Sequence, residues 1–288
     1  MRSVVFIAAS MFLLAVLGPL LAPHDPTAIN IPERLSPLND DYWLGTDALG
    51  RDILSRLLYG ARWSLGLAFA ISLIGLWVGT LIGLVAALGG KLADWALMRT
   101  TDSFLAFPDL VAAVVIAGLL GAGTWSLILA LSVTGWVRYA RVARGIGLSL
   151  QTRGCVIQAR LAGLPPGSIA RWHYLPWLVP SLTVVWTSMF ARAILGISAL
   201  GFLGFGVQPP MPEWGTMLLD ARIHLRSTPL QMVWPGLAVV VSVLAINLAG
   251  DALRDAIADD GNQGTRPHRE KSRFSLPMPS PRHIRRSR

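Results

Sequence analysis

WVRYARVARGIGLSLQTRGCVIQARLAGLPPGSIARWHYLPWLVP, residues 136–180, is the stretch from which the rest of the chain is best understood. It is the longest basic interruption of a very apolar sequence, and it contains no aspartate or glutamate. Its arginines are Arg138, Arg141, Arg144, Arg153, Arg160 and Arg171. Because apolar segments flank it on both sides, the stretch is expected on the cytoplasmic side of a membrane. Its helical pattern favours a docking element over a simple connection.

The composition around this stretch is typical of an integral membrane protein. The 288 residues are 53% hydrophobic and only 14% charged, with a mean hydropathy of +0.54. Several runs approach the roughly 20 apolar residues that cross a hydrocarbon core of about 30 Å. Spanning backbone must satisfy its own hydrogen bonds, and the runs are continuous rather than alternating, which favours helices over a barrel. We therefore expect an all-α integral membrane protein.

The apolar runs predict six transmembrane helices. They cover residues 4–22, 64–88, 104–120, 125–139, 177–205 and 230–250. The first run could be a cleaved signal peptide, but Pro23 directly after Ala22 disfavours cleavage. Short connections are expected at 89–103, on the inner side, and at 121–124. Outer connections are expected at 23–62, with tight turns and a helix from Ile53, and at 206–229.

The distribution of basic residues predicts that both termini are cytoplasmic. With six spans, the inner side carries 18 lysines and arginines and the outer side 6, or 10 against 6 without the tail beyond residue 259. This topology explains the net charge of +9 better than a nucleic-acid surface does, so no nucleic-acid partner is expected. The single cysteine, Cys155, excludes an internal disulfide, and no Cys/His cluster has metal-binding spacing, so neither a metal site nor a cofactor is expected.

A few residues inside the spans are candidates for functional roles. Gly75, Gly79 and Gly83 share one helical face, where a helix of the same or another subunit can approach closely. Arg192 is a charge within an apolar run, so it is expected to face a pore or a subunit interface, with snorkelling or pairing to a polar group as the alternative. Asn247, near the inner end of the last span, is a further candidate for a pore or subunit-interface position, although its place near the boundary favours a helix-end role.

Four stretches together resemble one family of membrane proteins. They are LGTDALGRDILSRLLYGARWSL (44–65), the inner loop with Ala159, Gly163 and Leu175-Pro176, ISALGFLGFGVQPPMPEWGTMLLDAR (197–222) and VWPGLAVVVSVLAINLAGDALRD (233–255). In this order they resemble permease subunits of the peptide/nickel ABC importer family, and the last stretch is most similar to nickel-type permeases.

The resemblance implies a type I ABC importer permease in a bacterial inner membrane, forming half of a translocation pathway. The expected partners are a second permease subunit, which would usually make a heterodimer, two ABC ATPase subunits, an extracytoplasmic solute-binding protein and membrane lipid. The expected solute is nickel or a nickel or other metal chelate, with dipeptides or oligopeptides as the alternative. The chain has no ATPase motif, so it is not expected to be an enzyme.

The resemblance also divides the chain and places its coupling residues. It implies a first helix and outer loop (1–62), a permease core (63–255) with a cytoplasmic coupling loop (138–176), and a basic tail (256–288) that composition predicts to be disordered and close to anionic lipid. A coupling helix is expected within residues 155–166. The residues that would couple to the ATPase are Ile157, Gln158, Ala159, Gly163, Leu164 and Pro176.

Two departures from the family pattern affect this coupling segment. Ile157 stands where the family has a glutamate, and a proline pair, Pro165-Pro166, follows Gly163. Because proline breaks a helix interior, the pair is expected to separate two short helices.

Two other classes of protein fit the sequence less well. An intramembrane enzyme would need HExxH, GxSxG or paired membrane aspartates, none of which occurs. An ion-driven secondary transporter would need more mid-membrane charges than Arg192 and an inverted repeat.

Overall fold

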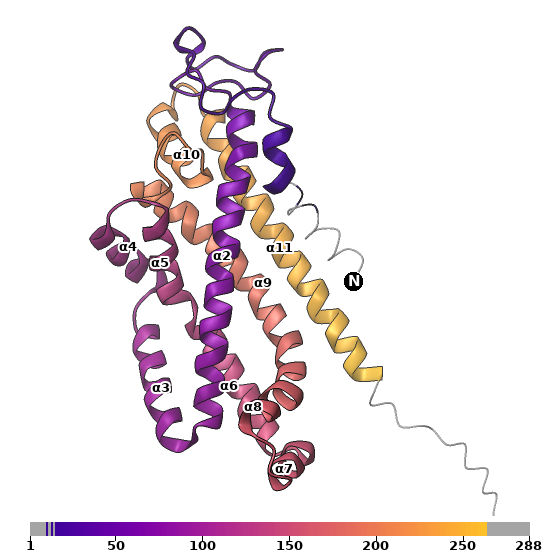
Figure 1. Cartoon of the computed structure of the whole chain (residues 1–288). Helices are drawn as coiled ribbons and strands as arrows, with labels where there is room; N and C mark the ends of the chain where they lie inside the picture. The colour runs from indigo at the N-terminus through magenta and orange to yellow at the C-terminus, as the bar shows by residue number, and fades with distance from the viewer. Residues whose placement is uncertain (1–9, 11–12, 14, 264–288) are drawn as a thin grey trace, which may run out of the picture.

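The described part of the chain is a bundle of long helices with turns at both ends. The computed structural model describes residues 10, 13 and 15–263. Most of the predicted first span, 4–22, and the tail beyond Gln263 therefore lie outside the described residues. Within them, the only strand-like feature is one isolated bridge between Thr46 and Asp52. The helices α2 and α9 run along the long axis, with α10 at one end and α7 and α8 at the other (Figure 1). We call these the α10 end and the α7 end.

Helix α2 (Ile53–Leu88) is the central element of the bundle. It begins where Asp52 caps its first turn by accepting a hydrogen bond from the backbone N–H of Ser55 at 2.9 Å. Its 36 residues give a length of about 54 Å, well beyond the roughly 30 Å of the hydrocarbon core. The predicted helix from Ile53 and the predicted span 64–88 are thus confirmed as one continuous helix, whose first turns extend toward the α10 end.

The segment after α2 corrects the prediction of a short loop and one straight span. Residues 89–103 are not a loop but most of α3 (Gly90–Leu105), and α4 (Asp109–Leu120) follows at a bend of 86°. The break falls just before Pro108, which has no N–H to donate and holds the preceding residue out of the helical region. Asp109 then begins α4, where a negative charge interacts favourably with the helix dipole.

The basic stretch also begins as a helix rather than a loop. The predicted span 125–139 is α5 (Thr124–Gly135), which continues past Trp136 into α6 (Val137–Gln151). The first half of the predicted coupling loop, 138–176, is therefore part of the bundle. The arginines in the sequence favour a loop, whereas the alanines and glycines between them fit a packed helix.

The last two long helices follow the predicted spans more closely. The predicted span 177–205 is α9 (Leu175–Leu200) with a π-helical turn (Gly201–Phe205), and the outer connection that follows contains α10 (Trp214–Ala221). The last helix, α11 (Leu230–Gln263), continues beyond the predicted boundary at residue 250. Residues 256–263 of the predicted tail are therefore helical. Among the described residues, three helices are long and apolar enough to cross a membrane, or four if α3 and α4 form one bent span.

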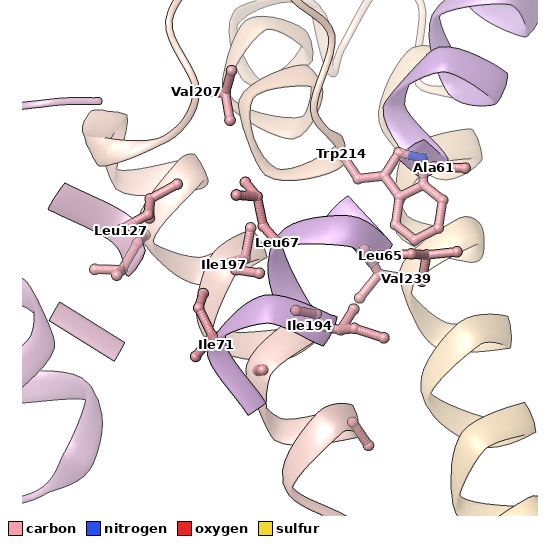
Figure 2. Packing of buried hydrophobic residues seen from close by; sticks show 14 of the residues in the cluster. Ala61, Leu65, Leu67, Ile71, Leu127, Ile194, Ile197, Val207, Trp214 and Val239 are labelled. Carbon is pink, nitrogen blue, oxygen red and sulfur yellow. The ribbon is translucent and has the colours of Figure 1, made fainter. Parts of the chain in front are cut away.

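Of three apolar clusters among the described residues, the two larger ones hold the bundle together. The larger one lies between α2, α9 and α11 toward the α10 end, where Leu65, Ile194 and Val239 meet the indole of Trp214 (Figure 2). The second lies toward the α7 end and includes Tyr139, Leu150, Val156, Tyr174 and Leu178. Because α7 contributes Val156 to this second cluster, the short helices at that end are attached to the long ones by buried side chains.

Candidate functional site

Helix α7 (Gly154–Leu161) projects from one end of the molecule (Figure 1) and has one buried and one exposed face. Val156 and Ala159 are buried in the second apolar cluster. On the other face, Ile157, Leu161 and Leu164 are 45%, 83% and 43% exposed. Val156 and Ala159 are three residues apart and therefore lie on the same side of the helix, which they anchor to the bundle. The exposed apolar side chains are therefore held rigidly outward, as a docking surface requires.

Gly163 follows the end of α7 and turns the chain sharply. Its φ of +73° lies in the left-handed region, which side chains other than glycine's disfavour. The backbone N–H groups of Leu164 and Gly163 donate to the carbonyls of Ala159 and Arg160 at 3.2 and 3.0 Å. This pair of bonds is the Schellman arrangement, which satisfies the last carbonyls of a helix and reverses the chain.

The proline pair separates two short helices, as predicted. Helix α8 (Pro166–Ile169) begins directly after Pro165, and a π-helical turn (Ala170–Tyr174) leads from it into α9. Pro176 lies in the first turn of α9, where a missing N–H costs no internal hydrogen bond. Ile169 and Tyr174 are buried, so this connection is packed against the bundle.

The predicted coupling residues therefore fall into two groups. Ile157, Gln158, Gly163 and Leu164 are exposed on α7 and its terminal turn. Ala159 is only 5% exposed and faces inward, so it anchors the helix and has no surface to offer a partner. Pro176 belongs to the start of α9 rather than to α7.

Three arginines of the basic stretch are paired within the chain. On α6, Arg138, Arg141 and Arg144 lie three residues apart and so share one face. Arg141 contacts Asp102 at 2.6 Å, and Arg144 makes two hydrogen bonds to Asp94; both acids are on α3. Arg138 lies 3.7 Å from Asp109 at the start of α4.

Two more arginines of the stretch lie on aromatic rings. Arg153 stacks on Trp177 at 4.1 Å and Arg171 on Trp172 at 5.7 Å. Of the six arginines, only Arg160 has neither an ion pair nor a stacked ring among the described residues.

The glycine stripe of α2 makes a contact inside the chain. A Cβ at Gly79 would overlap the backbone oxygen of Trp136 and lie 2.6 Å from Tyr139 Cβ, and one at Gly83 would lie 2.8 Å from Ala143 Cβ. Gly75 also faces α6 near Tyr139. The stripe therefore lets α2 and α6 approach closely, and α6 of the same chain covers it.

Arg192 lies on α9 and lines a hollow of about 440 Å³ together with Arg138, Asp109 and Gly75. Its side chain is exposed, and it makes neither an ion pair nor a hydrogen bond with any described residue. Asn247 is exposed on α11, well inside a helix that continues to Gln263. The predicted helix-end role of Asn247 is therefore wrong, because α11 continues past the apolar run.

Sequence reasoning missed Glu213, which is completely buried at the α10 end. Its carboxylate accepts hydrogen bonds from the backbone N–H groups of Gly215 and Thr216, at 2.7 and 3.0 Å, and from the hydroxyl of Ser64 on α2 at 3.2 Å. Burial raises the pKa of Glu213, and these three donors oppose the shift. The local pattern of an acid before a helix was visible, but Ser64 is 149 residues away.

An ion network at the same end of the molecule joins the outer connection and the first turn of α2 to α10. Arg51 contacts Asp47 at 2.6 Å, and both Arg51 and Arg56 lie within 3.7 Å of Asp220 on α10. Burial raises the pKa of Asp220, which Arg56 and Arg51 partly offset. Asp47 also accepts backbone hydrogen bonds from Leu49 and Arg51, which confirms the predicted capped turns. Residues 47–56 and helix α10 lie far apart in the sequence, and these ion pairs join them into one rigid cap at the α10 end.

The long apolar helices, with α7 projecting at one end and α10 packed at the other, fit a membrane-embedded helical bundle. Residues 75–260 match the family described as "Binding-protein-dependent transport system inner membrane component", and the chain belongs to this family. It is thus a multi-pass inner-membrane protein of the ABC importer permease class, and its relatives are permease subunits rather than enzymes.

Individual relatives are similar over most of the chain. The nickel transport system permease protein NikC of Escherichia coli is 41% identical over 88% of this chain and 92% of its own length. The di/tripeptide transport system permease protein DppC of Pseudomonas aeruginosa is 41% identical over 84% and 82%. Among solved structures, an inward-facing MetNI methionine ABC transporter superposes with a TM-score of 0.58 and 21% identity, covering 70% of this chain and 96% of that one. That similarity supports the type I permease fold.

Proposed function

We propose that this protein forms half of the translocation pathway of an ABC importer for nickel or a nickel or other metal chelate. The 41% identity to NikC over 88% of the chain favours this solute. Uptake of dipeptides or oligopeptides is the alternative, because a di/tripeptide permease is equally identical over nearly the same share of the chain. In either case the chain supplies the pathway, while partner subunits capture the solute and hydrolyse ATP.

The observation that carries the proposal is the two-faced helix α7. Its buried stripe joins it to the second apolar cluster, which also contains Leu178 and Leu182 of α9. A partner that moved α7 would therefore move α9, because the buried contacts leave little room for independent motion. Docking of an ATPase subunit on the exposed face gives ATP binding a mechanical route to the spans.

The chemistry of the exposed face indicates how the ATPase would bind. Ile157 replaces the family's glutamate, so the contact rests on Ile157, Leu161 and Leu164 with Gln158 at its edge. Arg160 of α7 interacts with Tyr174 but makes no ion pair with any described residue, and it can pair with an acidic group on the ATPase. Because Arg141 and Arg144 are paired to α3, they contribute less to docking than their number in the sequence suggested.

The topology that fits this function has six spans with both termini in the cytoplasm. The α7 end then lies inside and the α10 end outside. The bent α3–α4 pair is the third span of this topology, and its first span is the apolar run 4–22 predicted from the sequence, most of which lies outside the described residues. The rigid cap built by Arg51, Arg56 and Asp220 then faces the solute-binding protein. A second permease subunit, in a heterodimer, completes the pathway, and two ATPase subunits serve the two copies of the coupling segment.

ATP-driven uptake in reconstituted vesicles tests the proposal. The chain, its partner permease, the ATPase subunits and the binding protein are assembled, and uptake of radioactive nickel and of a labelled dipeptide is measured with ATP or with a proton gradient. We expect ATP-dependent uptake, and we expect a deletion of residues 158–163 to abolish both uptake and stimulated ATPase activity while the protein still inserts into the membrane.

Two results would contradict the proposal. If no ATPase subunit co-purifies with the wild-type protein, it is not an ABC permease subunit in that assembly. If uptake survives loss of ATP but not of the proton gradient, the protein is a secondary transporter.

A further inference from the structure

One face of α9 borders the 440 Å³ hollow described above. Met189, Arg192, Gly196 and Ala199 all line it and recur at intervals of three or four residues. Such spacing places them in one stripe along the helix. Gly196 and Ala199, which follow Arg192 in this stripe, have little or no side chain and leave room beside its guanidinium. Arg192 thus places a cation in the wall of the hollow.

Arg192 has no counter-charge among the described residues. A guanidinium exposed to hydrocarbon costs several kcal/mol, so a charge within a span faces water, a protein partner or a passing solute. Arg138 also lines the hollow, but Asp109 lies 3.7 Å from it. With two arginines and one aspartate, the hollow carries a net positive charge, and Arg192 is its unpaired donor.

The positive charge continues toward the α7 end. A second hollow, of about 900 Å³, shares Arg138 and Met189 with the first one. It is also lined by Arg141 of α6 and by Arg254 of α11. The two hollows thus form one groove along α6 and α9, with arginines from its middle to the α7 end. A lipid-facing surface would not repeatedly present such charges.

We propose that this groove is the transit surface for the solute and that Arg192 recognises a carboxylate on it. The inference rests on the proposed function and narrows its solute to one that carries a carboxylate, such as a metal bound by a carboxylate chelator or a peptide with a free C-terminus. A guanidinium presents a planar fork of N–H donors that matches a carboxylate.

A bare divalent cation does not fit this groove. Arginines repel it, and no group of three or more metal-binding side chains occurs in the described part of the chain. A nickel ion wrapped in carboxylates presents negative oxygens to the groove instead. Nickel and peptide transport thereby need the same recognition chemistry, which fits the equal similarity to permeases of both kinds.

The test compares Arg192→Glu, Arg192→Gln and Arg192→Lys with the wild type in the reconstituted importer. The probes are nickel chloride alone, nickel with excess citrate, alanyl-alanine, and the C-terminal amide of alanyl-alanine. Because the binding protein is the same in every assay, a changed preference between probes arises after solute capture. Arg226→Gln, an exposed arginine outside both hollows, is the matched control.

We expect the wild type to carry nickel–citrate or alanyl-alanine in preference to nickel chloride or the amide. Arg192→Glu and Arg192→Gln should lower uptake of the carboxylate-bearing probe by about tenfold, the loss of one charge-assisted hydrogen bond, and Arg192→Lys by less. Arg226→Gln should keep the wild-type preference. Uptake of nickel–citrate would assign the carboxylate to a metal chelator, and uptake of alanyl-alanine would assign it to the C-terminus of a peptide.

Three outcomes would overturn the inference. The first is an equal loss of uptake for all four probes. The second is a loss of co-purifying partner permease in the Arg192 variants, which would assign Arg192 to a subunit contact. The third is a wild-type preference for nickel chloride or the amide. An absence of ATP-driven uptake of every probe by the wild type would instead refute the proposed function.

Discussion

At the scale of single residues, Gly163 is a position where the backbone conformation, rather than the available space, requires glycine. A Cβ there would meet no atom within 4 Å, so space does not require glycine. The requirement comes from the φ of +73°, at which other residues are strained by about 1–2 kcal/mol. The turn at Gly163 was predictable because a glycine at a helix end usually adopts the left-handed conformation that terminates the helix. The inward orientation of Ala159 was not, because its partners lie on other helices.

We predict that Gly163→Ala weakens coupling, because the strained turn frays the end of α7 and loosens Leu164. The measurement is ATPase activity stimulated by the binding protein, together with uptake per ATP hydrolysed. Gly154→Ala is the control, since Gly154 is also exposed on α7 and unobstructed but has no positive φ. The explanation is wrong if both alanine variants behave alike.

Glu213 shows how one buried carboxyl can make stability depend on pH. Burial raises its pKa, so the native protein holds this proton more tightly than the unfolded chain does. Between the ordinary glutamic acid pKa of about 4.3 and the raised native pKa, the native state binds more protons. The stabilisation from this group is therefore complete below that window and is lost as the pH rises through it.

We predict that Glu213→Gln flattens this pH dependence of the unfolding temperature, which tryptophan fluorescence in detergent can follow. The neutral amide cannot ionise, so the decline that accompanies rising pH in the wild type should shrink. Glu33→Gln, at a glutamate of the outer connection that is not fully buried, should keep the wild-type slope. Equal slopes for wild type and Glu213→Gln would contradict the account.

At the scale of elements, the contact between α2 and α6 sets the spacing of the bundle. Continuous apolar runs predicted α2, α9 and α11, because such runs are long enough to span a membrane. The same reasoning failed for α6, where the arginines that suggested a loop are paired to aspartates 39 and 50 residues away. Pairing over such distances leaves no local pattern. The bend at Pro108 had a visible cause, but its angle depends on packing.

We predict that Gly79→Ala lowers the free energy of unfolding by about 1–3 kcal/mol, as overpacking does in tight interiors. The added methyl group would overlap the backbone of Trp136, which cannot rotate away. Gly66→Ala is the control in the same helix, since a Cβ there meets nothing within 4 Å. That variant should be neutral or slightly stabilised by helix propensity. Unfolding in detergent measures both, and an equal effect would disprove the tight contact.

At the scale of the whole molecule, the two ends serve different tasks. The α10 end is fastened by Glu213 and by the ion network of Arg51, Arg56 and Asp220. The α7 end projects a helix whose apolar side chains are held outward. The bias of basic residues predicts that the α7 end faces the cytoplasm. The groove lined by Arg192 joins the middle of the bundle to the α7 end.

Cys155 provides the most direct test of the central claim that α7 is the cytoplasmic docking helix for the ATPase. It is the only cysteine of the chain, and it is exposed on α7. The measurement is its rate of labelling by a membrane-impermeant maleimide, in intact cells and in inside-out vesicles with and without the ATPase subunits. We predict no labelling in cells, rapid labelling in stripped vesicles, and strong protection when the ATPase is added back. Labelling from outside, or an unchanged rate with the ATPase bound, would contradict the claim.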